Sequence, residues 1–365
     1  MNGSSRYAEG NSSSRYADRN SGSRYVNRNS SSRYGDKNGN RRYGRAGQRG
    51  SGTGKRRPYR RRRSKRVFYL CMIVFLLLVI ACGAGTLFLY KKSAGNAPEV
   101  SVDLEMLDSP YAVLLDGKTG TVLASKKSTE KIFPASMVKI MTVLTAIDSI
   151  KNLDEKITMS YDFYDSLYER DASRAGFEPG EEAVVRDLLY GAILPSGAEC
   201  CMQLAIQAAG SEEAFVGKMN EKAAELGLEQ THFTNCTGLH DDNQYSTVEE
   251  IGLILCSALK NKTFHKVFTT QTYTVGASEV HPDGFTFSSS MFKNMESPTV
   301  IGGEIKGGKT GYTDEAGHCL ASMAEIQGRE YILVTAGWAA DPRTTQYHIN
   351  DAFLGYSALG RALGG

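Results

Sequence analysis

The chain has 365 residues and carries 43 Lys and Arg against 40 Asp and Glu, a net charge of +3. That length exceeds what one globular domain usually needs but does not clearly require three. Of the seven cysteines, five follow the apolar segment 67–90, an odd number with no C-x-x-C pair and no zinc spacing. A disulfide scaffold is therefore not expected, and these cysteines are expected to be buried thiols.

Residues 1–66 are strongly basic, with 20 Lys and Arg against 3 Asp and Glu, whereas residues 93–365 hold 21 basic and 37 acidic residues. Residues 1–66 lack aliphatic residues that could form a core, so they are predicted to be a disordered tail. Arg beside Tyr could bind anionic lipid, a cytoplasmic partner or single-stranded nucleic acid, or the tail could simply be solvated. An SRY-like repeat places tyrosines nine residues apart, at Tyr7, Tyr16, Tyr25, Tyr34 and Tyr43.

Residues 67–90 contain no charged residue in 24 positions. At about 1.5 Å rise per residue, such a helix crosses a hydrocarbon core of about 30 Å. The basic cluster 56–66 abuts its N-terminal end, so residues 1–66 are predicted to be cytoplasmic and the chain beyond a linker, 91–109, extracytoplasmic. We therefore expect a single-pass cell-membrane protein. A cleaved signal peptide and lipidation at Cys82 are the two alternatives.

Residues 110–365 are predicted to form one extracytoplasmic α/β domain with an antiparallel sheet covered by helices. It begins with a strand hairpin around the turn DGKTG (116–120), and a second apolar hairpin spans 318–338 around QGRE. Short strands are also expected at 272–276 and 285–289. Apolar residues at three- and four-residue steps predict helices at 136–150, 185–194, 199–210, 211–227, 247–261 and 348–363.

Ser136 and Lys139 stand three residues apart in FPASMVK, at the beginning of a predicted helix. Residues at i and i+3 share one face of a helix, so the ammonium can reach the hydroxyl. A serine needs a base beside it to become a nucleophile, and lysine can be that base if burial lowers its pKa. Alone, the motif fits equally a helix cap followed by a surface lysine.

Two further short motifs follow. Pro195-Ser196-Gly197 interrupts two predicted helices and could present a hydroxyl to a cleft, or could be a simple turn. Lys309-Thr310-Gly311 enters a predicted strand, where a cation and a hydroxyl could meet an anionic group, and the glycine leaves room for a substrate backbone. The two lie far apart in the sequence, so a shared site requires the fold to bring them together.

Residues 303–310, GEIKGGKT, match the phosphate-loop pattern G-x-x-x-x-G-K-[ST]. A phosphate loop joins a strand to a helix. Here a strand hairpin follows, and the predicted topology places Lys309 outside the cell, so ATP is not an expected ligand. The other GKTG, at 117–120, is predicted to be a hairpin turn with Lys118 at its exposed tip.

Taken in the order S-x-x-K, S-x-x, K-T-G, the three motifs resemble those of the penicillin-recognising serine enzymes, and most closely the low-molecular-mass D-alanyl-D-alanine carboxypeptidases. The resemblance covers about residues 105–360 and includes the longer phrases FPASMVKIMTVLTAI and GGKTGYTDEAGHCLAS. It implies a β-lactamase/transpeptidase-like fold. It also implies cell-wall peptidoglycan stem peptides ending in D-Ala-D-Ala as substrates and β-lactams as inhibitors, with no metal or other cofactor.

The resemblance further implies a role for each motif residue. Ser136 would form an acyl-enzyme with Lys139 as general base, and Ser196 would relay a proton to the leaving D-alanine. Lys309 and Thr310 would bind the terminal carboxylate, and Gly311 would lie against the substrate. The backbone N–H groups of Ser136 and Tyr312 would form the oxyanion hole.

One residue departs from the family pattern. The second motif usually reads S-x-N, but here it is Ser196-Gly197-Ala198, so the amide that normally contacts the substrate peptide and the active-site lysine is missing. Glu199 is a candidate to compensate. The alternatives are therefore a non-catalytic or weakly active wall-binding scaffold and a DD-endopeptidase. A β-lactamase is disfavoured because no E-x-x-x-N follows the second motif, and a metallopeptidase because the histidines lack metal spacing.

Overall fold

The computed structural model describes residues 72, 101–339 and 346–364. Residues 101–364 belong to one compact unit. Within the described residues, no helix has both the length and the apolar character that a membrane crossing requires. The predicted tail, all of the predicted span except Met72, and the linker as far as residue 100 lie outside the described residues, so these predictions remain untested.

A six-stranded sheet forms the centre of the unit, with the strand order β2-β1-β10-β9-β8-β7. Every neighbouring pair is antiparallel, and the N-terminal hairpin joins the sheet by pairing β1 with β10. Both hairpins predicted for this sheet are confirmed. The strands are β1 (Tyr111–Asp116), β2 (Val122–Lys126), β7 (Thr299–Val300), β8 (Gly303–Thr313), β9 (Gly317–Ile326) and β10 (Arg329–Trp338).

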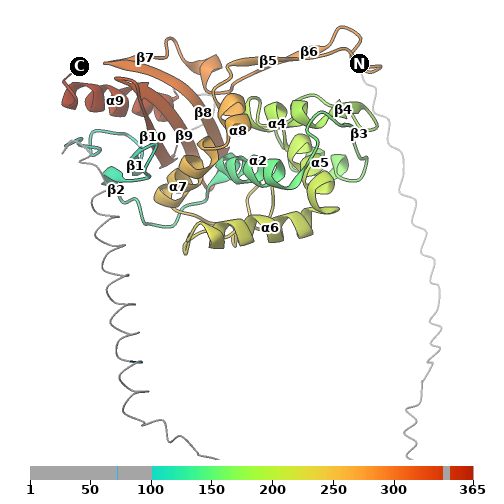
Figure 1. Ribbon diagram of the computed structural model, residues 1–365, viewed down its shortest axis with the longest axis horizontal. Coiled ribbons are helices and arrows are strands. Elements are labelled where there is room, and N and C mark those ends of the chain that lie inside the picture. The colour runs from blue at the N-terminus through green and yellow to red at the C-terminus, as the bar shows by residue number, and fades with distance from the viewer. Residues whose placement is uncertain (1–71, 73–100, 340–345, 365) are drawn as a thin grey trace, which may run out of the picture. The chain divides into compact units, whose positions relative to one another are not determined.

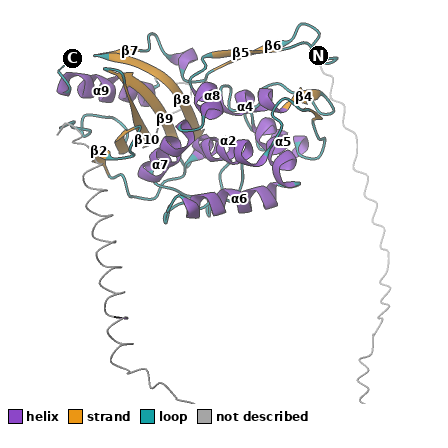
Figure 2. Cartoon of the chain, viewed as in Figure 1, coloured by secondary structure: helices purple, strands orange, loops and turns teal. Residues whose placement is uncertain are grey.

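Helices cover both faces of the sheet (Figure 1). The C-terminal helix α9 (Tyr347–Ala362) packs on β9 and β10 from one side, and α7 packs on β1 and β10 from the other. Figure 2 shows how the remaining helices extend this second layer away from the sheet. Apart from α9, the α-helices of this unit in the described residues are α2 (Val138–Ser149), α3 (Tyr164–Glu169), α4 (Val185–Ile193), α5 (Ala198–Ala209), α6 (Glu212–Glu225), α7 (Val248–Leu259) and α8 (Lys262–Phe268).

The sheet is buried on both faces because apolar residues occupy successive positions of its strands. In β1, Val113 and Leu115 belong to the larger core with the helices around α2, whereas Ala112 and Leu114 belong to a smaller core with α9. Successive side chains of a strand point to opposite faces, so one continuous apolar run serves both cores. This explains why the sequence of β1 is a run of consecutive apolar residues and not an alternation of apolar and polar ones.

The antiparallel α/β architecture predicted from the sequence is confirmed, with three differences in detail. The helix expected from Ser136 begins as a short 3-10 turn, η1 (Ala135–Met137), followed by α2. The hairpin of β3 (Lys156–Thr158) and β4 (Glu182–Val184) and the helices α3 and α8 were not predicted, because each element is too short to show a clear period. The two short strands predicted at 272–276 and 285–289 are present as β5 (Thr272–Val275) and β6 (Phe285–Ser288), and the structure pairs them as a hairpin.

The phosphate-loop pattern lies entirely inside a strand. Residues 303–310 belong to β8, which runs to Thr313 and turns directly into the antiparallel strand β9. No helix follows the motif in this described stretch, so its N–H groups belong to a sheet and not to a helix N-terminus. The expectation that GEIKGGKT is not a nucleotide site agrees with this geometry. The earlier GKTG, in turn, is the tight turn between β1 and β2.

Candidate active site

The 3-10 turn η1 presents Ser136 beside the strand β8. Ala135, immediately before it, adopts a left-handed backbone with φ of 45°. A side chain at Gly311 of β8 would come within 3.1 Å of both the Ala135 Cβ and the Ser136 amide nitrogen. Glycine at this position therefore lets the strand approach the turn closely. The backbone N–H of Ser136 and the edge of β8 face one another across this short gap.

Lys139 lies one turn further on, at the beginning of α2, and reaches back to the serine. Its Nζ donates a hydrogen bond to Ser136 Oγ at 2.9 Å and a second one to the carbonyl oxygen of Thr237 at 2.5 Å. The side chain is almost fully buried, at 2% exposure. Burial lowers the pKa of Lys139 below the 10.5 of a solvated lysine. The predicted contact between this lysine and the serine hydroxyl is thus present, with the surroundings that a lysine base needs.

Ser196 occupies the turn between α4 and α5 in a left-handed conformation with φ of 71°. Its hydroxyl is buried and, among the described residues, has no hydrogen-bond partner. A neighbouring loop holds the turn in place: Ser173 Oγ donates to the carbonyl of Ser196 at 2.9 Å, and the amide of Ala198 donates to the carbonyl of Ser173 at 2.8 Å. A strained backbone that carries an unpaired hydroxyl into a cleft is typical of a functional site.

The K-T-G residues of β8 point in different directions. Lys309 is fully buried on the side of the larger core and pairs in register with Ala321, whereas Thr310 pairs with Leu320 of the smaller core. Lys309 Nζ donates to the Thr310 carbonyl at 2.7 Å. Its burial and the nearby Lys139 ammonium bring the pKa of Lys309 well below its usual range. Thr310 therefore faces the cleft directly, and Lys309 stands behind it.

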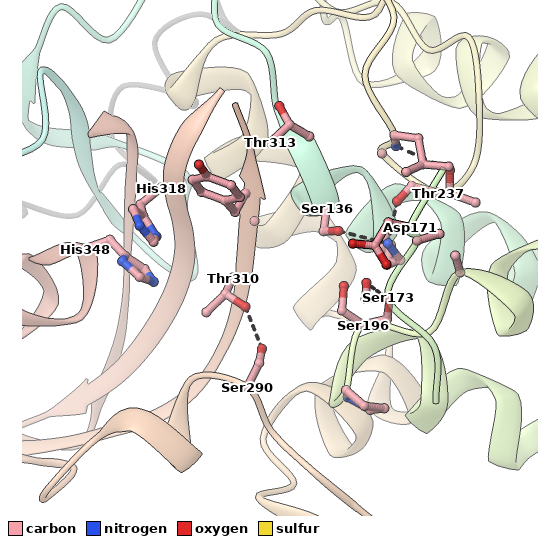
Figure 3. A pocket seen from close by; sticks show the side chains of 18 of the residues that line it. Ser136, Asp171, Ser173, Ser196, Thr237, Ser290, Thr310, Thr313, His318 and His348 are labelled. Carbon is pink, nitrogen blue, oxygen red and sulfur yellow. Dashed lines mark hydrogen bonds between the residues drawn. The ribbon is translucent and has the colours of Figure 1, made fainter. Parts of the chain in front are cut away.

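These elements enclose a cleft of about 350 Å³ (Figure 3). It contains the predicted Ser136, Lys139, Ser196, Thr310, Gly311 and Tyr312, but Lys309 is not among its lining residues. The fold thus brings together three motifs that lie far apart in the sequence. Lining residues that the sequence motifs did not indicate include Asp171, Ser173, Thr237, Ser290, His318 and His348.

Two of these additional residues lie next to predicted ones. Ser290 Oγ is 2.5 Å from Thr310 Oγ1, as the dashed line in Figure 3 shows. His318 is the cross-strand partner of Tyr312 and stacks on His348 of α9, with ring centroids 4.8 Å apart. Burial lowers the pKa of His348 to about 3, so this imidazole is neutral near pH 7. Neither contact could be predicted from a sequence motif, because both depend on the tertiary pairing of distant segments.

Glu199 does not take the place of the missing amide. Its Oε1 accepts hydrogen bonds from the backbone N–H groups of Ala175 and Gly176, at 2.6 and 2.9 Å, and it is not among the residues that line the cleft. Burial raises the pKa of Glu199 above its usual value. The carboxyl group therefore holds the loop beside Ser196, while Ala198 contributes only a methyl group to the cleft wall.

The loop that carries Thr237 also fixes the turn of the nucleophile, and a mutation can test this. Gly238 has a φ of 78°, and a side chain there would overlap the carbonyl oxygen of Ala135. We expect Gly238→Ala to destabilise the fold by about 1–3 kcal/mol through backbone strain alone. It should also slow any acylation of Ser136. Thermal unfolding checks the first effect, and Gly227→Ala is the control, since Gly227 has a similar φ of 73° and open space around it. Equal losses in both variants would contradict the overlap.

Known proteins with this fold share the same arrangement of sheet and helices. The crystal structure of the Streptomyces K15 DD-transpeptidase superposes with a TM-score of 0.63 and 27% identity, and the match covers 73% of this chain and 100% of that one. The structure is thus of the serine DD-peptidase fold class. The D-alanyl-D-alanine carboxypeptidase family matches residues 97–339, so the chain belongs to this family.

Curated relatives support the same assignment. The chain is 37% identical to the D-alanyl-D-alanine carboxypeptidase DacF of Bacillus subtilis over 236 residues, which are 65% of this chain and 59% of the relative. It is 33% identical to the D-alanyl-D-alanine carboxypeptidase of Streptomyces sp. (strain K15), over 70% of this chain and 88% of that protein. The match thus spans less than two thirds of the Bacillus relative but most of the Streptomyces one.

Proposed function

We propose that this protein is a serine-type D-alanyl-D-alanine carboxypeptidase that removes the terminal D-alanine from peptidoglycan stem peptides. The observation that carries the proposal is the pair of Ser136 and the buried Lys139, joined by a hydrogen bond of 2.9 Å at the wall of the cleft. A lysine whose pKa is lowered by burial is more readily present as the neutral amine that can take the serine proton. Membership of the D-alanyl-D-alanine carboxypeptidase family supports the choice of substrate.

The reaction proceeds in two steps. The proton of the Ser136 hydroxyl moves to Lys139 Nζ as Oγ forms a bond to the carbonyl carbon between the two D-alanines. The carbon–nitrogen bond then breaks, and the leaving amine takes up a proton that the unpaired hydroxyl of Ser196 can pass on. Water next attacks the ester, with Lys139 again as base, and releases the shortened peptide and free Ser136.

The strand β8 supplies the binding groups for this reaction. Among the described residues, the part of β8 that faces η1 pairs with β9 on one side and with no strand on the other, so a substrate in extended conformation can lie along this edge. The N–H groups of Ser136 and Tyr312 are assigned to the oxyanion. The hydroxyl of Thr310 is assigned to the terminal carboxylate, and the buried Lys309, whose Nζ donates to the Thr310 carbonyl, holds this part of the strand from behind.

The proposal is tested with the full-length protein and a stem pentapeptide ending in D-Ala-D-Ala. We expect stoichiometric release of D-alanine, and no release from the same peptide ending in D-Ala-L-Ala. Two stem peptides joined by a cross-link, offered as substrate, test the endopeptidase alternative. A D-alanyl-D-alanine endopeptidase of Pseudomonas aeruginosa that is 30% identical to this chain is the reason to include this test. Penicillin labelling without turnover of either peptide would favour the scaffold alternative, and rapid antibiotic hydrolysis would favour a β-lactamase.

We also propose that the protein is a single-pass membrane protein with residues 67–90 as its anchor and residues 1–66 in the cytoplasm. The support is the uncharged segment and the basic cluster before it. A substrate in the cell wall requires the catalytic part on the outer side, which agrees with this orientation. The basic tail beneath the membrane is assigned to anionic lipid or a cytoplasmic partner. Protease digestion of intact cells tests the orientation, since it should remove the catalytic part and spare the tail.

A further inference from the structure

The loop of residues 234–239, between α6 and α7, closes over the beginning of α2. Its Thr237 carbonyl accepts the second hydrogen bond of Lys139, and Gly238 packs against the backbone of Ala135. Thr237 is 3% exposed. The lysine thus has two acceptors, one on the serine that it activates and one on this loop. Nothing in the three sequence motifs accounts for the second acceptor.

One side chain determines the conformation of this loop. Asn235 Oδ1 accepts hydrogen bonds from the Thr237 amide at 3.2 Å, the Thr237 hydroxyl at 3.0 Å and the Gly238 amide at 2.8 Å. Its Nδ2 donates to the carbonyl of Leu239 at 2.9 Å. Four bonds from one amide fix the peptide plane after Thr237, and with it the direction of the Thr237 carbonyl.

We infer that Asn235 is a positioning residue for the acylation step: by fixing the Thr237 carbonyl, it orients the amine of Lys139 toward Ser136 and sets the basicity of that amine. The inference rests on the proposed function in taking Lys139 as the base. Asn235 touches neither the serine nor the cleft, since it is not among the lining residues. Its effect on the reaction passes through the loop that it holds, and toward Lys139 through the Thr237 carbonyl.

The chemistry of a lysine base explains why the second acceptor matters. A neutral amine has two hydrogens and one lone pair, and only the lone pair can accept the proton of Ser136. In the charged form the ammonium donates to both Ser136 Oγ and the Thr237 carbonyl. In the neutral form the Thr237 carbonyl keeps one hydrogen, so the lone pair can take the place of the hydrogen that pointed to the serine and accept from its hydroxyl. A carbonyl at hydrogen-bond distance also favours the charged form of an amine over the neutral one, against the desolvation that lowers the pKa of Lys139.

Other titratable groups surround the same amine and have to be kept constant in any test. The helix α5 contributes a carboxyl and two thiols, the 234–239 loop a third thiol, and β8 a second ammonium. Burial raises the pKa of each thiol, so they are neutral near pH 7 and do not replace the carbonyl as a fixed acceptor. These groups are Glu199, Cys200, Cys201, Cys236 and Lys309.

The test compares two substitutions of Asn235 in the full-length protein. In Asn235→Ala the Thr237 carbonyl is no longer held in place, so the acylation rate with penicillin should fall at least about tenfold. Because the charged form of Lys139 then loses an acceptor, the acidic limb of the pH profile of acylation should move to lower pH by on the order of one unit. In Asn235→Asp the acceptor oxygens remain and a negative charge is added, so the limb should move to higher pH. Titration of Lys139 by ¹⁵N-lysine NMR should shift in the same two directions.

Asn220→Ala is the matched control. Asn220 also secures this part of the chain, through bonds of its Nδ2 to the carbonyls of Val216 and Phe233 and of its Oδ1 to the Phe233 amide, but it does not bind Thr237. This variant should lower the melting temperature and leave both the pH profile and the Lys139 titration unchanged.

Three outcomes would overturn the inference: an unchanged Lys139 titration in Asn235→Ala, the same direction of shift in Asn235→Ala and Asn235→Asp, or an equal shift in Asn220→Ala. A wild-type protein that penicillin does not label would instead refute the proposed function. The NMR titration would still decide the role of Asn235 toward the lysine in that case. If the alanine variant does not fold, the aspartate variant carries the test, because it retains the acceptor oxygens.

Discussion

Ser136→Ala is expected to abolish acylation by penicillin and the release of D-alanine, with a loss of about 10³- to 10⁶-fold in rate. The substitution removes the oxygen that forms the acyl-enzyme, and no other hydroxyl stands at 2.9 Å from Lys139 Nζ in the described structure. The fold should be retained, because η1 is held by Gly238 and Gly311 and not by the serine side chain. A fluorescent penicillin and gel detection give the readout.

The control for this experiment is Ser128→Ala. Ser128 is buried, and its hydroxyl donates to Glu249 away from the cleft, so the variant should label as the wild type does. Label on Ser136→Ala, located by mass spectrometry on Ser196 or another residue, would show that the nucleophile has been assigned wrongly. Unchanged D-alanine release in this variant would have the same meaning.

Lys139→Met should reduce the acylation rate by about 10²- to 10⁴-fold, the usual contribution of a general base. Methionine retains the buried, unbranched shape and removes the amine, so packing changes little. In the wild type, burial lowers the pKa of Lys139, so acylation should increase with pH through a limb that lies below 10.5. Below that limb the amine is protonated and cannot accept the serine proton. In the methionine variant this limb should disappear.

Lys222→Met is the control for the charge change. Lys222 forms ion pairs with Asp148 and Glu225 at the surface of α6, so its removal alters the net charge by the same amount without touching the cleft. Acylation and its pH profile should remain those of the wild type. A Lys139→Met protein that retains both the rate and the acidic limb would exclude this lysine as the base.

Several parts of the fold follow from local sequence. The apolar run of β1 and the turn DGKTG predict a hairpin, and the structure contains it. The i, i+3 spacing of Ser136 and Lys139 predicts their contact, and the hydrogen bond of 2.9 Å is present. These features could be predicted because each depends on neighbours in the sequence.

The parts that could not be predicted depend on distant pairing. Thr237 meets Lys139 only because the 234–239 loop folds back over α2, and no pattern in THFTNCTGLH indicates that its backbone carbonyl is the relevant group. The resemblance predicts that Lys309 and Thr310 bind one carboxylate, and no observation contradicts it. The motif does not by itself indicate that these neighbouring strand residues lie on opposite faces, with Thr310 lining the cleft and Lys309 outside the lining. Short elements such as α3 gave too little periodic signal.

The pairing of β1 with β10 also has a consequence for how the chain folds. Tyr111, near the beginning of the described unit, lies beside Ala336, near its end. The central sheet therefore cannot close until almost the whole unit is available, and folding is expected to be slow, as for other proteins rich in contacts between distant residues. In the membrane topology proposed above, the cleft could therefore form only after β10 has reached the outer side of the membrane.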